Sequence, residues 1–162
     1  MVGSIIGLLK QIDGVYREIY ALSEKKQEHI IANDAEAVNE IVKEEWKLLA
    51  KAGELEDKRI SLVQEFLGKG KDSSSSLQDL MAAAPPDKRQ ELEFVSKDLK
   101  NLLEKQKQIN EENRSLIELH LEYMDYMVNT VLKEPQVSDI YGNSGVVADA
   151  NTANKGIIDN EA

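Results

Sequence analysis

The fold is decided by residues 92–127, which read LEFVSKDLKNLLEKQKQINEENRSLIELHLEYMDYM. Apolar side chains return there in a seven-residue register, at Leu92, Val95, Leu99, Leu102, Ile109, Leu116, Tyr123 and Met127. Such a register is typical of helices that pack as coiled coils. It predicts one helix from about Asp87 to Lys133, which at about 1.5 Å per residue spans roughly 70 Å. Two other helices or a partner must cover an apolar stripe of that length.

A first long helix is predicted upstream, from about Gly3 to Ile31. Its apolar residues alternate steps of three and four, at Ile5, Leu8, Ile12, Val15, Ile19 and Leu22. Asn33 can adopt the left-handed conformation that ends a helix, and Asp34 can cap the next one. These two residues therefore predict a tight turn between two long helices.

The second long helix carries a wide apolar stripe that ends at Gly68 and Gly70. A short helix is expected after the run of serines at 73–76, and Pro85 with Pro86 separates it from the longest helix. The sequence therefore predicts an all-α fold, an elongated antiparallel bundle of three long, coiled-coil-like helices with a short helix in the second connection.

The helical pattern stops at Pro135, and the residues beyond it are rich in Asn, Gly, Ser, Asp and Ala. We predict a helical domain over residues 1–134 and a flexible, partner-binding tail over residues 135–162. Val137, Ile140 and Tyr141 form an apolar island in this tail, at helical spacing. Such islands are typical of segments that fold on binding a partner, and an inert tail is the alternative.

Composition disfavours several classes of function. The formal net charge of −10 opposes binding to nucleic acid and to anionic membranes, which depends on Lys and Arg. The sequence has no cysteine and nothing close to the roughly 20 apolar residues of a membrane span. It also has no phosphate-binding glycine loop, metal-ligand spacing or nucleophile elbow. We therefore expect a cytoplasmic, non-enzymatic protein with no cofactor, metal site or catalytic residue and no membrane insertion.

Polar residues interrupt the apolar register. Gln106, Asn113 and His120 fall seven residues apart on the seam of the longest helix, where buried polar groups can fix register and partner number. The alternative is a partly covered stretch that leaves a polar-lined groove for a partner helix. Glu45 interrupts the second helix, and we expect its stem to pack while its charge reaches water. Trp46 is expected to pack against a third helix, and a binding hot spot is the alternative.

The end of the longest helix is apolar around much of its circumference, and Tyr123, Tyr126, Met127 and Val131 are candidate partner-binding residues, together with Met124, Val128 and Leu132. One neighbouring helix cannot cover all of these side chains. Methionine adapts to irregular partners, and tyrosine is enriched in interfaces. Burial of the same cluster by the first two helices is the alternative.

The layout resembles the FlgN family of flagellar export chaperones. The resemblance rests on Leu8 and Leu9, the turn at Asn33 and Asp34, Lys47 to Leu49, the Ser-rich break, Asn101, Leu102 and Asn113, and the tail. It implies a chaperone that binds the hook-filament junction proteins FlgK and FlgL and delivers them to the type III export gate, where FlhA receives the complex. It also implies cargo recognition by the C-terminal part, with Ile140 and Tyr141 as candidate contacts.

Two other functions are compatible with the sequence. A generic coiled-coil adaptor or oligomerisation protein would use the apolar seam itself and would not need the tail. A phosphotransfer domain would need an exposed His120, although Glu118 and Glu122 would repel a phosphoryl donor. Because polar seam residues weaken a self-paired helix, we expect a monomer or a weak homodimer.

Overall fold

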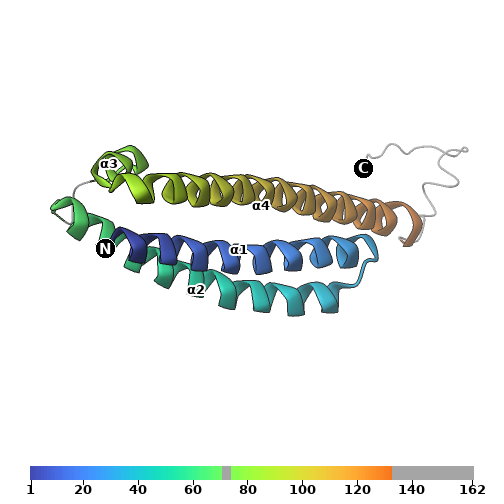
Figure 1. The fold of residues 1–162 in the computed structure, drawn as a ribbon. Helices are drawn as coiled ribbons and strands as arrows, with labels where there is room; N and C mark the ends of the chain where they lie inside the picture. The colour runs from blue at the N-terminus through green and yellow to red at the C-terminus, as the bar shows by residue number, and fades with distance from the viewer. Residues whose placement is uncertain (71–73, 133–162) are drawn as a thin grey trace, which may run out of the picture. The chain divides into compact units, whose positions relative to one another are not determined.

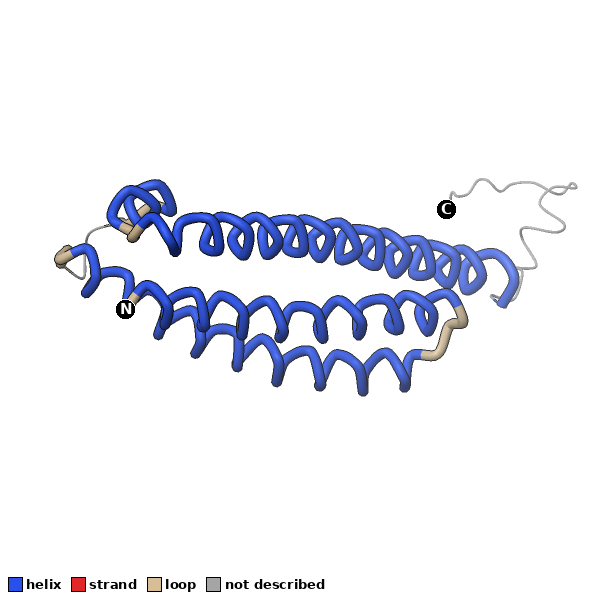
Figure 2. The backbone as a smooth tube through the Cα atoms, in the orientation of Figure 1, coloured by secondary structure: helices blue, strands red, loops and turns tan. Residues whose placement is uncertain are grey.

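The computed structural model describes residues 1–70 and 74–132, and within these ranges all regular structure is helical. The elements are α1 (Val2–Ile31), α2 (Ala35–Leu67), α3 (Leu77–Ala83), α4 (Pro86–Met127) and a π-helical turn, η1 (Val128–Leu132) (Figure 1; Figure 2). The prediction of an all-α chain with three long helices and one short helix is confirmed. The predicted tail at 135–162 lies outside the described residues.

Local sequence signals set the helix limits. Asn33 has a positive φ of 59°, and the Asp34 side chain accepts a hydrogen bond from the Ala37 backbone N–H at 3.1 Å. Gly68 ends α2 in the left-handed conformation, with a φ of 65°, which glycine adopts without a Cβ clash. These residues produce the predicted turn and the predicted end of the second helix. The longest helix begins at Pro86, one residue before the predicted start.

α1 and α2 lie side by side and run in opposite directions (Figure 1). The predicted α1 residues Ile5, Ile12, Val15 and Ile19 are all buried, and Leu8 and Leu22 are half-buried. One core cluster joins them to Leu55 and Val63 of α2 and to residues of α3 and α4, including Leu80, Leu92, Val95 and Leu99. The apolar register of each long helix therefore faces a common core within residues 1–118.

α4 runs in the same direction as α1. Lys10 Nζ lies 2.8 Å from Glu91 Oε1, and one Arg17 guanidinium nitrogen lies 2.8 Å from Asp98 Oδ2. The two pairs have the same sequence separation, 81 residues, which is possible only if the helices are parallel. Lys10 holds the pKa of Glu91 below its ordinary value, chiefly through this hydrogen bond.

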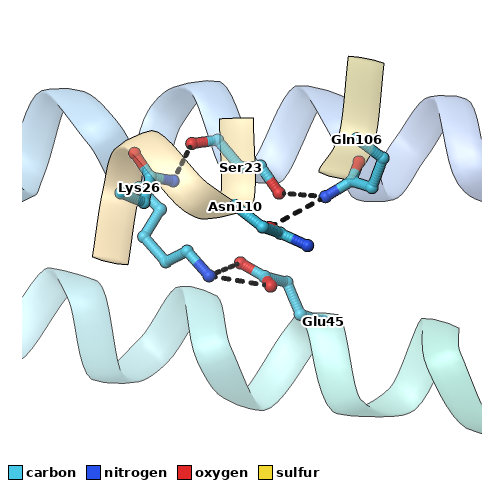
Figure 3. A network of polar contacts seen from close by, with 6 residues as sticks. Ser23, Lys26, Glu45, Gln106 and Asn110 are labelled. Atoms are coloured by element: carbon cyan, nitrogen blue, oxygen red, sulfur yellow. Dashed lines mark hydrogen bonds and ion pairs between the residues drawn. The ribbon is translucent and has the colours of Figure 1, made fainter. Parts of the chain in front are cut away.

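The buried polar residues of α4 bond to α1. Gln106 Nε2 donates hydrogen bonds to Ser23 Oγ at 2.8 Å and to Asn110 Oδ1 at 3.1 Å (Figure 3). Asn113 Nδ2 donates to the Ser23 carbonyl oxygen at 3.0 Å, and both Gln106 and Asn113 are buried. For these two residues the first interpretation, polar groups inside the core seam, is confirmed. His120, by contrast, is half-buried.

Two expectations for α2 are wrong. Glu45 is buried, and Lys26 Nζ lies 2.9 Å from both of its carboxylate oxygens (Figure 3). Its charge is therefore paired inside the protein rather than solvated. Trp46 does not pack against a third helix, because 69% of its surface is exposed. Trp46 follows the buried Glu45 by one residue, which is a rotation of about 100° around the helix axis, so its indole points away from the core.

The chain divides into two structural units, and the boundary follows Glu118, within α4. The first unit contains α1, α2, α3 and most of α4. The second begins at Leu119, and its described part is the end of α4 followed by η1. Over both described ranges, no helix combines the length and the apolar character that a membrane crossing requires.

Candidate partner-binding site

The last turns of α4 carry large apolar residues that the described part of the chain leaves exposed. Up to Asn113 the seam of α4 is buried, whereas Leu116 is only half-buried. Among residues 119–130, the exposed large apolar residues are Leu119, Leu121, Tyr123, Met124, Tyr126 and Val128. An apolar pattern that changes from buried to exposed along a helix is typical of a contact surface.

One face of this segment is formed by Leu119, Tyr123 and Tyr126. Their spacing of four and three residues stacks them along one side of an α-helix. The tyrosines are 58% and 59% exposed, and Leu119 is exposed to a similar degree. Each tyrosine combines a large apolar ring with a hydroxyl that can donate or accept a hydrogen bond. This face can therefore bind an apolar stripe with polar groups at its edge.

A second apolar face lies on the other side of the same turns. Leu121, Met124 and Val128 are exposed, and Leu121 follows Leu119 by two residues, a rotation of about 200° around the helix axis. One partner helix cannot contact both sides of α4 at once. The segment can therefore bind two elements, or one element that wraps around it.

The helix changes its winding where these faces end. Val128–Leu132 form a π-helical turn, which has more residues per turn than an α-helix. Asn129 Nδ2 donates a hydrogen bond to the Asp125 carbonyl oxygen at 2.9 Å. The wider turn takes the backbone of residues 128–132 out of the α-helical register of Tyr123 and Tyr126.

The segment is also acidic. Glu118 pairs with Arg114 at 3.1 Å, whereas Glu122 and Asp125 are exposed and form no ion pair with any residue described by the structure. These carboxylates flank the two apolar faces. A partner with Lys or Arg beside its apolar residues would match them best.

The predicted site residues are only partly described. Tyr123 and Tyr126 are exposed and share a face, while Met127 is half-buried. Val131 lies in η1, and Val137, Ile140 and Tyr141 lie outside the described residues. Sequence reasoning missed Leu119 and Leu121, although the four-residue step from Leu119 to Tyr123 was a signal that could have identified the first of them.

The arrangement offers apolar area, phenol hydroxyls and carboxylates. In residues 1–70 and 74–132 no group of three or more His, Cys, Asp or Glu side chains is placed to hold a metal ion. His29 lies on α1, with Nδ1 3.5 Å from Asp34 Oδ2. The apolar area, phenol hydroxyls and carboxylates at the end of α4 are suited to non-covalent contacts with another polypeptide.

Comparison with known proteins agrees with the resemblance in the sequence. The family model described as FlgN protein matches residues 1–148. The chain is also 28% identical over 121 residues to the uncharacterized protein YvyG of Bacillus subtilis (strain 168), covering 75% of this chain and 74% of that protein. No solved structure matches the chain. The match to the family model spans nearly the whole sequence, so the chain belongs to the FlgN family of flagellar export chaperones.

Proposed function

We propose that this protein captures hook-filament junction proteins of the FlgK and FlgL type in the cytoplasm and delivers them to the flagellar type III export apparatus, where FlhA receives the complex. The apolar end of α4 is the proposed capture surface. Membership of the FlgN family supports the role of export chaperone.

The observation that carries this proposal is the exposure of two apolar faces between Leu119 and Val128. Contiguous apolar surface on a folded chain is costly to leave in water, and it usually marks a partner interface. Residues spaced three and four apart suit an amphipathic helix laid against α4. Since Glu122 and Asp125 lack ion-pair partners in the described part of the chain, the proposed cargo helix carries basic residues beside its apolar stripe.

The remaining helices act as the scaffold in this proposal. The three long helices form an antiparallel bundle within a domain of residues 1–134, and the bundle holds the capture surface at one end of α4. The tail, residues 135–162, extends that surface through Val137, Ile140 and Tyr141. It contacts cargo, FlhA or both.

Calorimetric titration with purified FlgK-type or FlgL-type protein tests the proposal. Tyr123→Ala combined with Tyr126→Ala should weaken binding about 30-fold or more, because loss of a central aromatic anchor costs about 2 kcal/mol or more. Trp46→Ala is the matched control, since it removes an exposed aromatic side chain from α2. Equal loss in the control, or full affinity in the double variant, would exclude the end of α4 as the capture surface.

A second candidate function, a coiled-coil oligomerisation protein, is favoured by exposed apolar residues on α2. Trp46, Leu49 and Ile60 are all at least 40% exposed. In this second function they would join copies of the chain. Sedimentation equilibrium decides between the functions, because a stable oligomer that is lost on Trp46→Ala would favour oligomerisation, and a monomer that still binds cargo would favour the chaperone.

A further inference from the structure

α2 carries a second row of residues beside the side that packs inside the first unit. The packed side includes the buried residues Ala52, Leu55 and Val63. The second row, here called the outer seam, follows the helix at alternating steps of four and three residues and consists of Val42, Trp46, Leu49, Gly53, Glu56 and Ile60. Its three largest apolar side chains, those of Trp46, Leu49 and Ile60, are exposed. The outer seam therefore has the spacing of a coiled-coil seam and is open to another helix.

Gly53 leaves free space near the middle of the outer seam. It is exposed, and an added Cβ would meet no described atom within 4 Å. Glycine lowers the stability of a helix interior, and the packing of the described residues does not require it here. A seam position without a side chain can receive a large apolar residue from a neighbouring helix.

One flank of the outer seam changes its charge along the helix. It begins with Lys43 and Lys47, passes the uncharged Ala50, and continues with Glu54 and Asp57. All five residues are exposed. Glu54 and Asp57 form no ion pair with any residue described by the structure. The flank thus has a basic half followed by an acidic half.

The other lysines in this part of α2 lie away from the outer seam. Lys51 follows Leu49 by two residues, and Lys58 follows Glu56 by two residues. Two residues correspond to a rotation of about 200° around the helix axis. Lys51 and Lys58 therefore lie on the opposite side of α2 and do not cancel the acidic half of the flank.

The basic half of the flank has weak pairs within its own helix. Lys43 Nζ lies 3.2 Å from Glu40 Oε2, and Lys47 Nζ lies 3.7 Å from Glu44 Oε2. All four side chains are at least 60% exposed, and exposed pairs of this kind contribute little to stability. Both lysines can therefore turn toward acidic groups of a partner.

We propose that the outer seam binds α2 of a second copy of this chain in antiparallel orientation. With the two-fold axis near residue 51, Lys43 lies opposite Asp57 of the second copy, and Lys47 lies opposite Glu54. A parallel pair would instead bring like charges together at each level. Sliding one copy by one heptad would place Lys43 opposite the uncharged Ala50. The charges of the flank therefore select both the orientation and the register of the second copy.

The same alignment gives each residue of the outer seam a partner. It pairs Val42 with Ile60, Trp46 with Glu56 and Leu49 with Gly53, and every contact occurs twice because the interface is two-fold symmetric. Leu49 enters the space beside Gly53. The indole N–H of Trp46 can donate a hydrogen bond to the Glu56 carboxylate. A contact of one helix with another is small for a protein interface, so the homodimer is weak and reversible.

This pairing differs from both functions considered above. It leaves the end of α4 free for cargo, so it does not rest on cargo capture. It is also a weak contact between chaperone molecules rather than the stable oligomer of the second candidate function.

Reversal of the charges tests the pairing. The full-length variant Lys43→Glu with Lys47→Glu has an acidic flank, and Glu54→Lys with Asp57→Lys has a basic flank. Analytical ultracentrifugation of cargo-free protein should show association that grows with concentration for the unmodified chain. Each variant alone should lose it at least tenfold, whereas an equal mixture of the two should regain it. All four positions are exposed, so the fold should be kept, which circular dichroism checks.

A matched pair of aromatic substitutions tests the outer seam itself. Trp46→Ala should weaken association at least tenfold. Phe94→Ala is the control, because Phe94 of α4 is 69% exposed, as is Trp46, and lies outside the outer seam. It should leave association unchanged.

The absence of cysteine from the chain permits a test of orientation. The full-length variants Glu44→Cys, Lys51→Cys and Lys58→Cys each carry one nitroxide label, and the three positions share one side of α2, seven residues apart. Pulsed electron paramagnetic resonance then measures the distance between the two labels of a dimer. The distance should be shortest at residue 51. At residues 44 and 58 the labels should be similarly far apart, with about 21 Å of additional separation along the helix axis.

Several results would overturn the proposal. These are a monomer at every concentration, charge variants that associate as the unmodified chain does, equal losses for Trp46→Ala and Phe94→Ala, or equal label distances at all three positions. Association that appears only after deletion of residues 135–162 would identify the tail as the occupant of the outer seam, and would also overturn it. None of these results bears on cargo capture at the end of α4, which the calorimetric titration measures separately.

Discussion

Gln106 and Ser23 are joined by a 2.8 Å hydrogen bond in the interior, 83 residues apart in sequence, with Gln106 Nε2 as the donor. Ser23 is fully buried, and its backbone carbonyl oxygen also accepts from Asn113. One small residue of α1 thus receives two side chains of α4, one helical heptad apart. A shift of α4 by one turn would leave these buried groups without partners, so this contact sets the register of the two helices.

Ser23→Ala should lower the free energy of unfolding by about 1–3 kcal/mol, because the Gln106 amide would lose one of its two acceptors while buried. Urea denaturation followed by circular dichroism measures the loss. Ala21→Ser is the control, since residue 21 is exposed on the same helix. An unchanged midpoint for Ser23→Ala would show that the hydrogen bond contributes nothing to stability.

Ile12→Asp and Ile19→Asp should each destabilise the first unit by roughly 3–5 kcal/mol, because both isoleucines are at most 3% exposed and the new carboxylate would have no partner. Thermal unfolding monitored by circular dichroism tests this. Ala21→Asp, at an exposed position, should change the melting temperature little. Similar melting of all three variants would mean that α1 does not pack as described.

Lys26→Met should lower the free energy of unfolding by about 3–5 kcal/mol, because it would leave the Glu45 carboxylate buried and unpaired. Adding Glu45→Leu should recover most of that loss, since an apolar pair of similar volume can replace a buried ion pair. A double-mutant cycle in urea gives the coupling energy. Additive effects of the two substitutions would contradict the direct pairing of these side chains.

Acid should loosen the N-terminus of α3 through Asp79. The hydrogen bond from Lys69, followed by that from the Ser76 backbone, holds the pKa of Asp79 below its ordinary value. A carboxylate with a depressed folded-state pKa contributes stability that is complete above its unfolded pKa of about 3.9, and this stability is lost as pH falls through the folded pKa.

The amide NMR signals of Leu77 and Asp79, followed between pH 6 and pH 2, measure this transition. Asp79→Asn should remove it, because the amide does not titrate in this range. Asp87→Asn, an exposed acidic residue in the first turn of α4, is the control and should leave the transition in place. A transition centred at or above the ordinary aspartate pKa would contradict the proposed contact with Lys69.

The sequence predicted the features that local signals determine. Asn33, Asp34 and Gly68 specify backbone conformations that few other residues adopt, so the turn and the end of α2 followed from residue type. The buried side of α1 could be predicted because apolar residues that alternate steps of three and four lie on one side of a helix. Buried Gln106 and Asn113 were also anticipated, although their shared acceptor, Ser23, was not.

The features that depend on the mutual rotation of the helices could not be predicted. The pairing of Glu45 with Lys26 and the exposure of Trp46 both follow from the rotation of α2 about its own axis, which its broad apolar stripe does not fix. In the candidate site, the tyrosines were identified by residue type, whereas Leu119 and Leu121 were overlooked because leucine is common in buried helix faces.

The parallel pairing of α1 with α4 also bears on the order of folding. Contacts between α1 and α2 join neighbouring segments across the turn at Asn33, whereas those between α1 and α4 join residues 81 to 90 positions apart. Closing such long loops has a larger entropic cost, so we expect the α1–α2 hairpin to form first and α4 to dock onto it later. During synthesis, the apolar side of that hairpin therefore stays exposed to water until residues 92–113 have left the ribosome.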